Sequence, residues 1–67
     1  MELYDVVELL TGLPNEGISA GAVGTVVHIF REPVLAYEVE FVGGDGRTAA
    51  MVTLAPAQLR VRRRHGA

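Results

Sequence analysis

Hydrophobic and polar positions alternate with a period of two in the middle of the chain. In the segment AYEVEFV, residues 36–42, Tyr37, Val39 and Phe41 share one face and the two glutamates between them share the other. This alternation is typical of an antiparallel strand that buries one face. The residues GGDG at 43–46 follow directly, and glycine and aspartate tolerate the backbone angles of a tight hairpin turn. The sequence therefore predicts a strand over 36–42 that turns back at 43–46.

The returning strand is predicted over residues 47–54, RTAAMVTL. Its two faces are similar in polarity, so the buried face depends on how the strand pairs with its neighbour. We favour the face that carries Ala50 and Val52. The buried side chains of the preceding strand are then expected to pack against Val52, Val6 and Val26.

Residues 24–30, GTVVHIF, are apolar on both faces, with Val27 and Ile29 on one side and Val26 and Phe30 on the other. This pattern predicts a strand that is covered on two sides. In a small barrel, one strongly bent strand can contribute to both halves of the core. Glycine is expected where such a strand bends or where another backbone comes close.

Glycine and proline mark the points where the chain bends or leaves a sheet. Gly21 and Gly24 lie where the strand over 24–30 is expected to bend. The connector REPVL, residues 31–35, contains a proline that cannot donate to a sheet ladder, so it is predicted to be a loop.

The N-terminal segment LYDVVELL, residues 3–10, is rich in β-branched and aromatic residues, and we favour a first strand there. Its apolar residues also fall at helical spacing, so a helix is the alternative. The segment TGLPNEGISAGA, residues 11–22, holds the glycines, proline and asparagine of a long loop, which is where binding residues are often found.

The C-terminal segment APAQLRVRR predicts a 3-10 turn around Pro56 and a last strand in which Leu59 and Val61 alternate with arginines. Together the elements predict an all-β fold, a small SH3-like five-stranded barrel. A long loop follows its first strand and a 3-10 turn precedes its last. We assign the barrel to residues 1–62 and a basic C-terminal tail to residues 63–67.

Composition limits the class of protein. A chain of 67 residues has room for one small domain, and without cysteine that domain depends on packing rather than on disulfides. The N-terminus is acidic where a signal peptide would be basic, and no apolar run approaches the ~20 residues of a membrane span. We therefore expect a cytoplasmic protein that does not enter a membrane.

The net charge of −2 is unevenly distributed. All eight acidic residues and two of the six arginines precede residue 60, a net charge of −6. The other four arginines, Arg60, Arg62, Arg63 and Arg64, give the last eight residues a charge of +4. An acidic body thus carries a basic tail.

No catalytic or metal-binding pattern stands out. Ser19 is the only serine, and His28 and His65 lie far apart without an orienting carboxylate nearby in the sequence. Glu38 and Glu40 share a strand face that is expected to be solvated, where they keep the sheet soluble. We expect no enzymatic activity, no metal and no other cofactor.

Four segments together resemble a small bacterial family known as domain of unknown function 4926. They are LYDVVELL, GAVGTVVHIF, AYEVEFVGGDGRT and TLAPAQLR, in that order along nearly the whole chain. The resemblance implies an SH3-like barrel and brings no established activity. It also suggests an antitoxin-like or accessory role beside another bacterial protein. GAVGTVV is similar as well to the KOW motif of ribosomal and transcription elongation proteins, although its flanks lack the basic residues of an RNA contact.

Two functions follow as hypotheses. The first is a protein-binding module that uses the 11–22 loop or an adjacent apolar strand face, because 49% hydrophobic residues are hard to bury in so small a chain. Its candidate residues are Leu13, Pro14, Asn15, Glu16 and Ile18, and a homodimer would cover the same surface. The alternative is a nucleic-acid-binding barrel that uses Arg60, Arg62, Arg63 and Arg64, although the acidic body opposes it.

Overall fold

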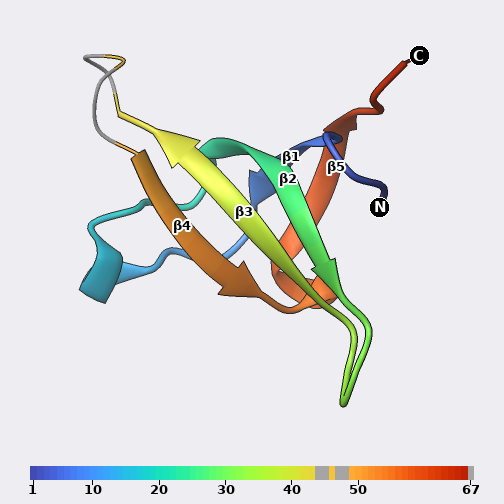
Figure 1. Ribbon diagram of the computed structural model, residues 1–67. Helices are drawn as coiled ribbons and strands as arrows, with labels where there is room; N and C mark the ends of the chain where they lie inside the picture. Colours follow the sequence, from blue (N-terminus) through green and yellow to red (C-terminus); the bar gives the residue numbers. More distant parts are fainter. Residues whose placement is uncertain (44–45, 47–48, 67) are drawn as a thin grey trace.

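The residues that the structure describes form one antiparallel sheet of five strands in the order β4-β3-β2-β1-β5 (Figure 1). The structure is a computed structural model, and it describes residues 1–43, 46 and 49–66. The elements are β1 Val6–Leu9, η1 Pro14–Glu16, β2 Val23–Phe30, β3 Ala36–Val42, β4 Ala49–Leu54, η2 Pro56–Gln58 and β5 Leu59–Arg63, where η denotes a 3-10 helix. The predicted all-β class, the long loop after the first strand and the 3-10 turn before the last are confirmed.

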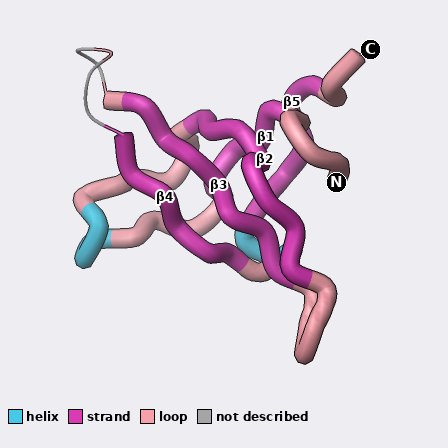
Figure 2. Tube along the Cα trace, in the orientation of Figure 1, coloured by secondary structure: helices cyan, strands magenta, loops and turns pink. Residues whose placement is uncertain are grey.

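The sheet is not closed into a barrel, which corrects the sequence-based expectation. β4 and β5 are its two edges, and no ladder joins them in the described part of the chain. The loop between β1 and β2 lies beside the outer edge of β4 instead, as the tube in Figure 2 shows. Leu13 and Ile18 from this loop pack against the core. Side chains of a loop, and not a further ladder, therefore cover this end of the core.

The central strand β2 bends and serves two neighbours. Its first residues, from Val23 to Thr25, pair with β1, and the segment from Thr25 to Phe30 pairs with β3. The register shifts between Val26 and His28, which is the signature of a β-bulge. A bent strand with two neighbours is thus present, but the expectation of a strand covered on two sides was wrong, because His28 and Phe30 on its outer face are exposed.

The bulge also changes which side chains of β2 face inward. Val26 lies opposite Val39 and is fully buried, and beyond the bulge Ile29 lies opposite the buried Tyr37. Phe30, expected on the same side as Val26, is instead 38% exposed. A single inserted residue reverses the alternation, because side chains along a strand repeat every two residues.

Gly24 lies close to the backbone and side chains of β3. A Cβ atom at this position would approach the backbone oxygen of Glu40 and the Cγ1 atom of Val39 to 2.7 Å each. These distances are too short for any side chain, so the close approach requires glycine. Gly21, just before the strand, has φ of +93°, a conformation that glycine adopts readily.

The core consists of apolar side chains from all five strands. Its buried members are Val7, Leu9, Val26, Tyr37, Val39, Phe41, Leu54 and Leu59. The predicted burial of the inward face of β3 is confirmed, with Val26 fully buried beside it and Val52 half-buried. The expectation for Val6 was wrong, because Val7 and Leu9 carry the inward face of β1 and Val6 is only half-buried.

The first and fourth strands are shorter than predicted. β1 is a strand and not a helix, but it starts at Val6, because Leu3 and Tyr4 form a turn in which Tyr4 has φ of +67°. β4 begins at Ala49, and residues 47–48 and the centre of the predicted 43–46 turn lie outside the described residues. The favoured inward face of β4 is confirmed, since Ala50 and Val52 are half-buried and the residues that alternate with them are exposed.

No helix among the described residues is long and apolar enough to span a membrane.

Candidate binding surface

Residues 11–22, here called the arm, form an ordered projection between β1 and β2. Leu13 and Ile18 pair across it, with the Leu13 N–H donating to the Ile18 oxygen at 2.7 Å and the Ile18 N–H donating back at 3.2 Å. Pro14 opens the 3-10 turn η1, where its fixed φ is suitable and its missing N–H costs nothing. Gly17 closes the turn in the left-handed region at φ of +69°. The arm is therefore held in shape by its own backbone.

The five residues predicted for partner binding all lie on this arm, where they divide into two groups. Leu13 and Ile18 are half-buried and anchor the arm to the core. Pro14, Asn15 and Glu16 form the 3-10 turn and are exposed at its tip. The residues that a partner can reach most directly are thus the three of the turn.

Two grooves lie between the arm and the strands beside it. The larger one, here called the upper groove, has a volume of about 400 Å³. Its apolar wall consists of Ile18, Ala22, Val23, Phe41, Val42 and Ala50. The smaller one, the lower groove, has a volume of about 290 Å³ and lies between the arm and the C-terminal half of β4. Its lining includes Leu13, Pro14, Asn15, Val52, Thr53 and Leu54. Glu16 lines both grooves, so the tip of the arm borders each of them.

Exposed apolar side chains extend this surface. Val23 is 48% exposed and Val42 is 59% exposed, and both line the upper groove. Met51 on the outer face of β4 is 62% exposed. An apolar strand face was predicted from the sequence, but Val23 and Val42 were not named. Each is a β-branched residue near the end of a strand, on the sheet face that carries the glutamates of β3, and this was the signal in the sequence.

The arginines predicted for nucleic-acid binding are largely engaged within the protein. Arg60 Nη2 lies 2.7 Å from Glu8 Oε1, and Arg62 Nη1 lies 3.2 Å from the same oxygen. The hydrogen bond from Arg60, with the charges of both arginines, lowers the pKa of Glu8. Arg60 lies directly opposite Glu8 in the β1–β5 ladder, so sheet register creates this cluster.

A second acidic residue holds the C-terminal segment. Asp5 is fully buried, and its Oδ1 accepts a hydrogen bond from the backbone N–H of His65 at 2.7 Å. Its Oδ2 accepts from the N–H of Glu2 at 2.8 Å and lies 3.9 Å from Arg64 Nη1. The hydrogen bonds from Glu2 and then His65 lower the pKa of Asp5, although burial opposes them. This role was not predicted from the sequence, where Asp5 is one of two acidic residues in the otherwise largely apolar segment 3–10.

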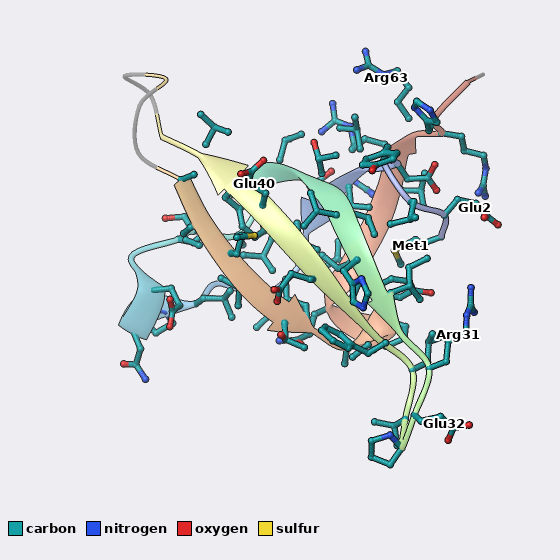
Figure 3. All side chains as sticks on the ribbon, in the orientation of Figure 1. Met1, Glu2, Arg31, Glu32, Glu40 and Arg63 are labelled. Carbon is teal, nitrogen blue, oxygen red and sulfur yellow. The ribbon has the colours of Figure 1, made fainter. Side chains whose placement is uncertain are left out.

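Arg63 differs from the other three arginines of the tail. It closes β5, and its side chain points away from the sheet in Figure 3. Among the described residues no ion pair involves Arg63, whereas the other three each lie within 4 Å of a carboxylate oxygen. The acidic residues of β1 and the turn before it thus compensate most of the charge of the tail.

Of the residues considered for catalysis, His28 and Glu38 lie directly opposite each other in the β2–β3 ladder, whereas Ser19 lies in the arm and His65 follows β5. His28 lies on the outer face of β2 with its ring 4.5 Å from that of Phe30, centroid to centroid, and His65 stacks edge-on against Tyr4. Glu38 accepts a hydrogen bond from the Thr53 hydroxyl at 2.8 Å. Within the described part of the chain, no group of three or more histidine, cysteine, aspartate or glutamate side chains is arranged to hold a metal ion.

Comparison with known proteins identifies a family. No curated protein and no solved structure matches the chain. One family model matches residues 3–61, from the turn before β1 to the middle of β5. This range includes the arm and both grooves, and the match confirms the family resemblance noted in the sequence. The chain therefore belongs to the family described as Domain of unknown function (DUF4926).

Proposed function

We propose that the protein is a small non-enzymatic binding module that docks on another protein through the tip of the arm and the two grooves beside it. The observation that carries this proposal is that Glu16 at the tip of the arm lines both grooves, on an arm whose backbone is closed by the Leu13–Ile18 pairing. A surface that is already ordered loses little conformational entropy when a partner binds.

Apolar exposure supports the same surface. Val23 and Val42 line the upper groove and are about half exposed, although the core of this small sheet lies directly beneath them. Contiguous exposed apolar surface with a polar rim is typical of protein interaction sites. A partner that covers the grooves would remove this surface from water. We propose an accessory role beside that partner, of the kind an antitoxin has.

The proposed fold type is an open form of the SH3-like arrangement. The strand order, the long connection between β1 and β2 and the 3-10 turn η2 before β5 support this assignment. In such an arrangement the long connection is free to form one wall of a binding surface, which is the place of the arm here.

Nucleic-acid binding through the arginines is the weaker proposal. Phosphate contacts need cationic side chains that are free to leave their present partners. Arg60 and Arg62 share Glu8, and Arg64 lies beside Asp5, so binding to phosphate would break three ion pairs. These three ion pairs therefore support a structural role for Arg60, Arg62 and Arg64.

The test is affinity capture from cells that naturally produce the protein, with nuclease added to the lysate. Asn15→Arg at the tip of the arm is compared with Val34→Arg, which introduces the same side chain at a residue that is 69% exposed in the β2–β3 hairpin. We expect the Asn15→Arg variant to lose a protein partner that the wild type and the Val34→Arg variant retain. Equal capture by both variants, or loss of the partner on nuclease treatment alone, would contradict the proposal.

A further inference from the structure

The two edge strands of the sheet differ in how they are protected. β5 carries Arg60, Arg62 and Arg63 along its short length. β4, with the sequence AAMVTL, carries no charged residue and no proline. Unpaired edges pair readily with other strands, and proteins usually protect them with charge, proline, a bulge or a covering loop. β4 lacks charge and proline, and although the arm lies beside it, none of the described backbone hydrogen bonds joins the arm to β4.

The two grooves lie along β4, and its inward side chains line them at the regular spacing of a strand. Ala50 lines the upper groove, and Val52 and Leu54 line the lower groove. These three inward residues are two positions apart, which corresponds to about 7 Å along a strand. A strand that lay between β4 and the arm would place its own inward side chains at the same intervals. The first and last of these inward side chains would reach the two grooves, and the one between them would lie beside Glu16, which lines both.

The charge beside the two grooves indicates which kind of central side chain is favoured in the added strand. Glu16 lines both grooves and is the only charged side chain among the described residues that line them. None of the described residues that line either groove is a lysine or arginine. A cationic side chain is therefore favoured between the two apolar ones. A second copy of this chain fits less well, because its own β4 carries no cationic side chain that could face Glu16.

We propose that an extended segment of a partner protein adds to the free edge of β4 as a further strand, with the pattern apolar, any residue, lysine or arginine, any residue, apolar. Its two apolar side chains enter the upper and lower grooves, and its central cation pairs with Glu16. This inference rests on the proposed binding function and specifies the kind of partner. Backbone hydrogen bonds to β4 supply affinity, and the grooves and Glu16 supply specificity.

The test uses the synthetic peptide acetyl-TVTKTVT-amide with the full-length, isotope-labelled protein. We expect the peptide to slow amide hydrogen exchange at alternate residues of Ala49–Leu54. Two further versions of the peptide carry N-methyl groups, one version on the odd-numbered residues and the other on the even-numbered residues. Only one set of N–H groups faces β4, so one version should lose binding and the other should keep it. Equal behaviour of the two versions, or no change at β4, would overturn the proposal.

A charge exchange tests the role of Glu16 and provides its own control. Replacing the peptide lysine with glutamate should weaken binding to the wild-type protein about tenfold, and the Glu16→Lys variant should prefer the glutamate peptide. Glu32→Lys makes the same change at an exposed residue of the β2–β3 hairpin and should leave the preference of the wild type intact. The peptide exchange needs no change in the protein, so it decides the matter even if a variant does not fold. An unchanged preference would refute the pairing with Glu16.

Two further results separate this inference from the binding function. Suppose that Asn15→Arg abolishes capture of the natural partner but the peptide does not slow amide exchange in β4. Strand addition is then wrong, and the binding function stands. If the peptide protects β4 while the captured partner is indifferent to Asn15→Arg, the arm is not the docking site of that partner, and the binding function as proposed falls. A free protein that is dimeric by light scattering, with β4 amides already protected, would make a second copy the occupant and overturn the proposal.

Discussion

Asp5 accepts a hydrogen bond from the backbone N–H of His65 at 2.7 Å, across 60 positions of the sequence. The same carboxylate accepts from the N–H of Glu2, so one buried side chain connects the two ends of the chain. In the described structure no buried side-chain nitrogen or oxygen lacks a hydrogen-bond partner. A carboxylate is suited to this position because it offers acceptors in two directions and its charge strengthens both hydrogen bonds.

The first prediction concerns acid stability. The pKa of Asp5 is lowered in the folded protein, so the unfolded state binds the proton more readily. The stabilisation from Asp5 is then complete above the usual aspartate pKa of about 3.9, and it is lost as the pH falls through the lower folded value. We expect Asp5→Asn to lower the melting temperature at neutral pH, and to approach the wild type as both are acidified.

The measurement is thermal unfolding between neutral pH and pH about 2. Glu2→Gln removes a nearby charge but keeps the backbone N–H, so its profile should follow that of the wild type. Part of the acid dependence should remain in Asp5→Asn, because the pKa of Glu8 is lowered as well. A constant difference between Asp5→Asn and the wild type at every pH would show that the charge of Asp5 does not matter.

The second prediction concerns the close approach of β2 and β3. Gly24→Ala would place a Cβ atom 2.7 Å from the Glu40 backbone oxygen, which cannot move without disturbing the β2–β3 ladder. We expect a loss of about 3 kcal/mol in the free energy of unfolding, measured by urea denaturation. Gly12→Ala is the matched control, because its nearest neighbour would be 3.5 Å away. Equal stability of the two variants would contradict the close packing at Gly24.

The third prediction concerns the core. Phe41 is 6% exposed, and Phe41→Ala should cost about 3–5 kcal/mol through lost burial and the cavity left behind. In a domain of this size that loss would unfold much of the protein. Phe41→Leu keeps most of the volume and allows a measurable transition, with an expected cost between those of the wild type and Phe41→Ala. Val42→Ala, on the exposed face of the same strand, should change stability little. Melting of Phe41→Ala at the wild-type temperature would refute this account.

The fourth prediction concerns the arginines. We expect no mobility shift of RNA or DNA by the wild type near physiological salt, because the acidic body repels the phosphate backbone. Replacement of Arg62, Arg63 and Arg64 by alanine should leave this result unchanged. It should lower stability through loss of the contacts with Glu8 and Asp5. A clear shift at micromolar protein that disappears in the triple variant would place nucleic-acid binding first.

The local sequence pattern was sufficient to predict a strand where the two-residue alternation and the flanking turn residues indicate the same boundaries. β3 spans the predicted residues 36–42, because its glutamates alternate with apolar side chains and the connections on either side contain proline or glycine. β5 and the 3-10 turn before it were predictable for the same reason. Gly24 could be singled out because glycine inside an otherwise apolar strand indicates a close neighbour.

Properties that depend on which strands meet were not in the local pattern. The bulge in β2 moves Ile29 inward and Phe30 outward, and its position depends on pairing with β3. Whether the sheet closes depends on whether β4 and β5 pair, and in the described part of the chain they do not. The sequence showed the arm as a loop but not the two grooves that Glu16 lines.

The sequence by itself determined the strand periodicity, the turn positions and the separation of an acidic body from a basic tail, because each follows from neighbours along the chain. The tertiary structure decided which charges meet. Antiparallel pairing of β1 with β5 brings Arg60 opposite Glu8. The turn before β1 places the Asp5 carboxylate within hydrogen-bond distance of the His65 backbone N–H. Charges that are far apart in sequence are strongly coupled only when folding brings them within a few ångströms. For this reason the arginines appeared free in the sequence and are largely paired in the folded protein.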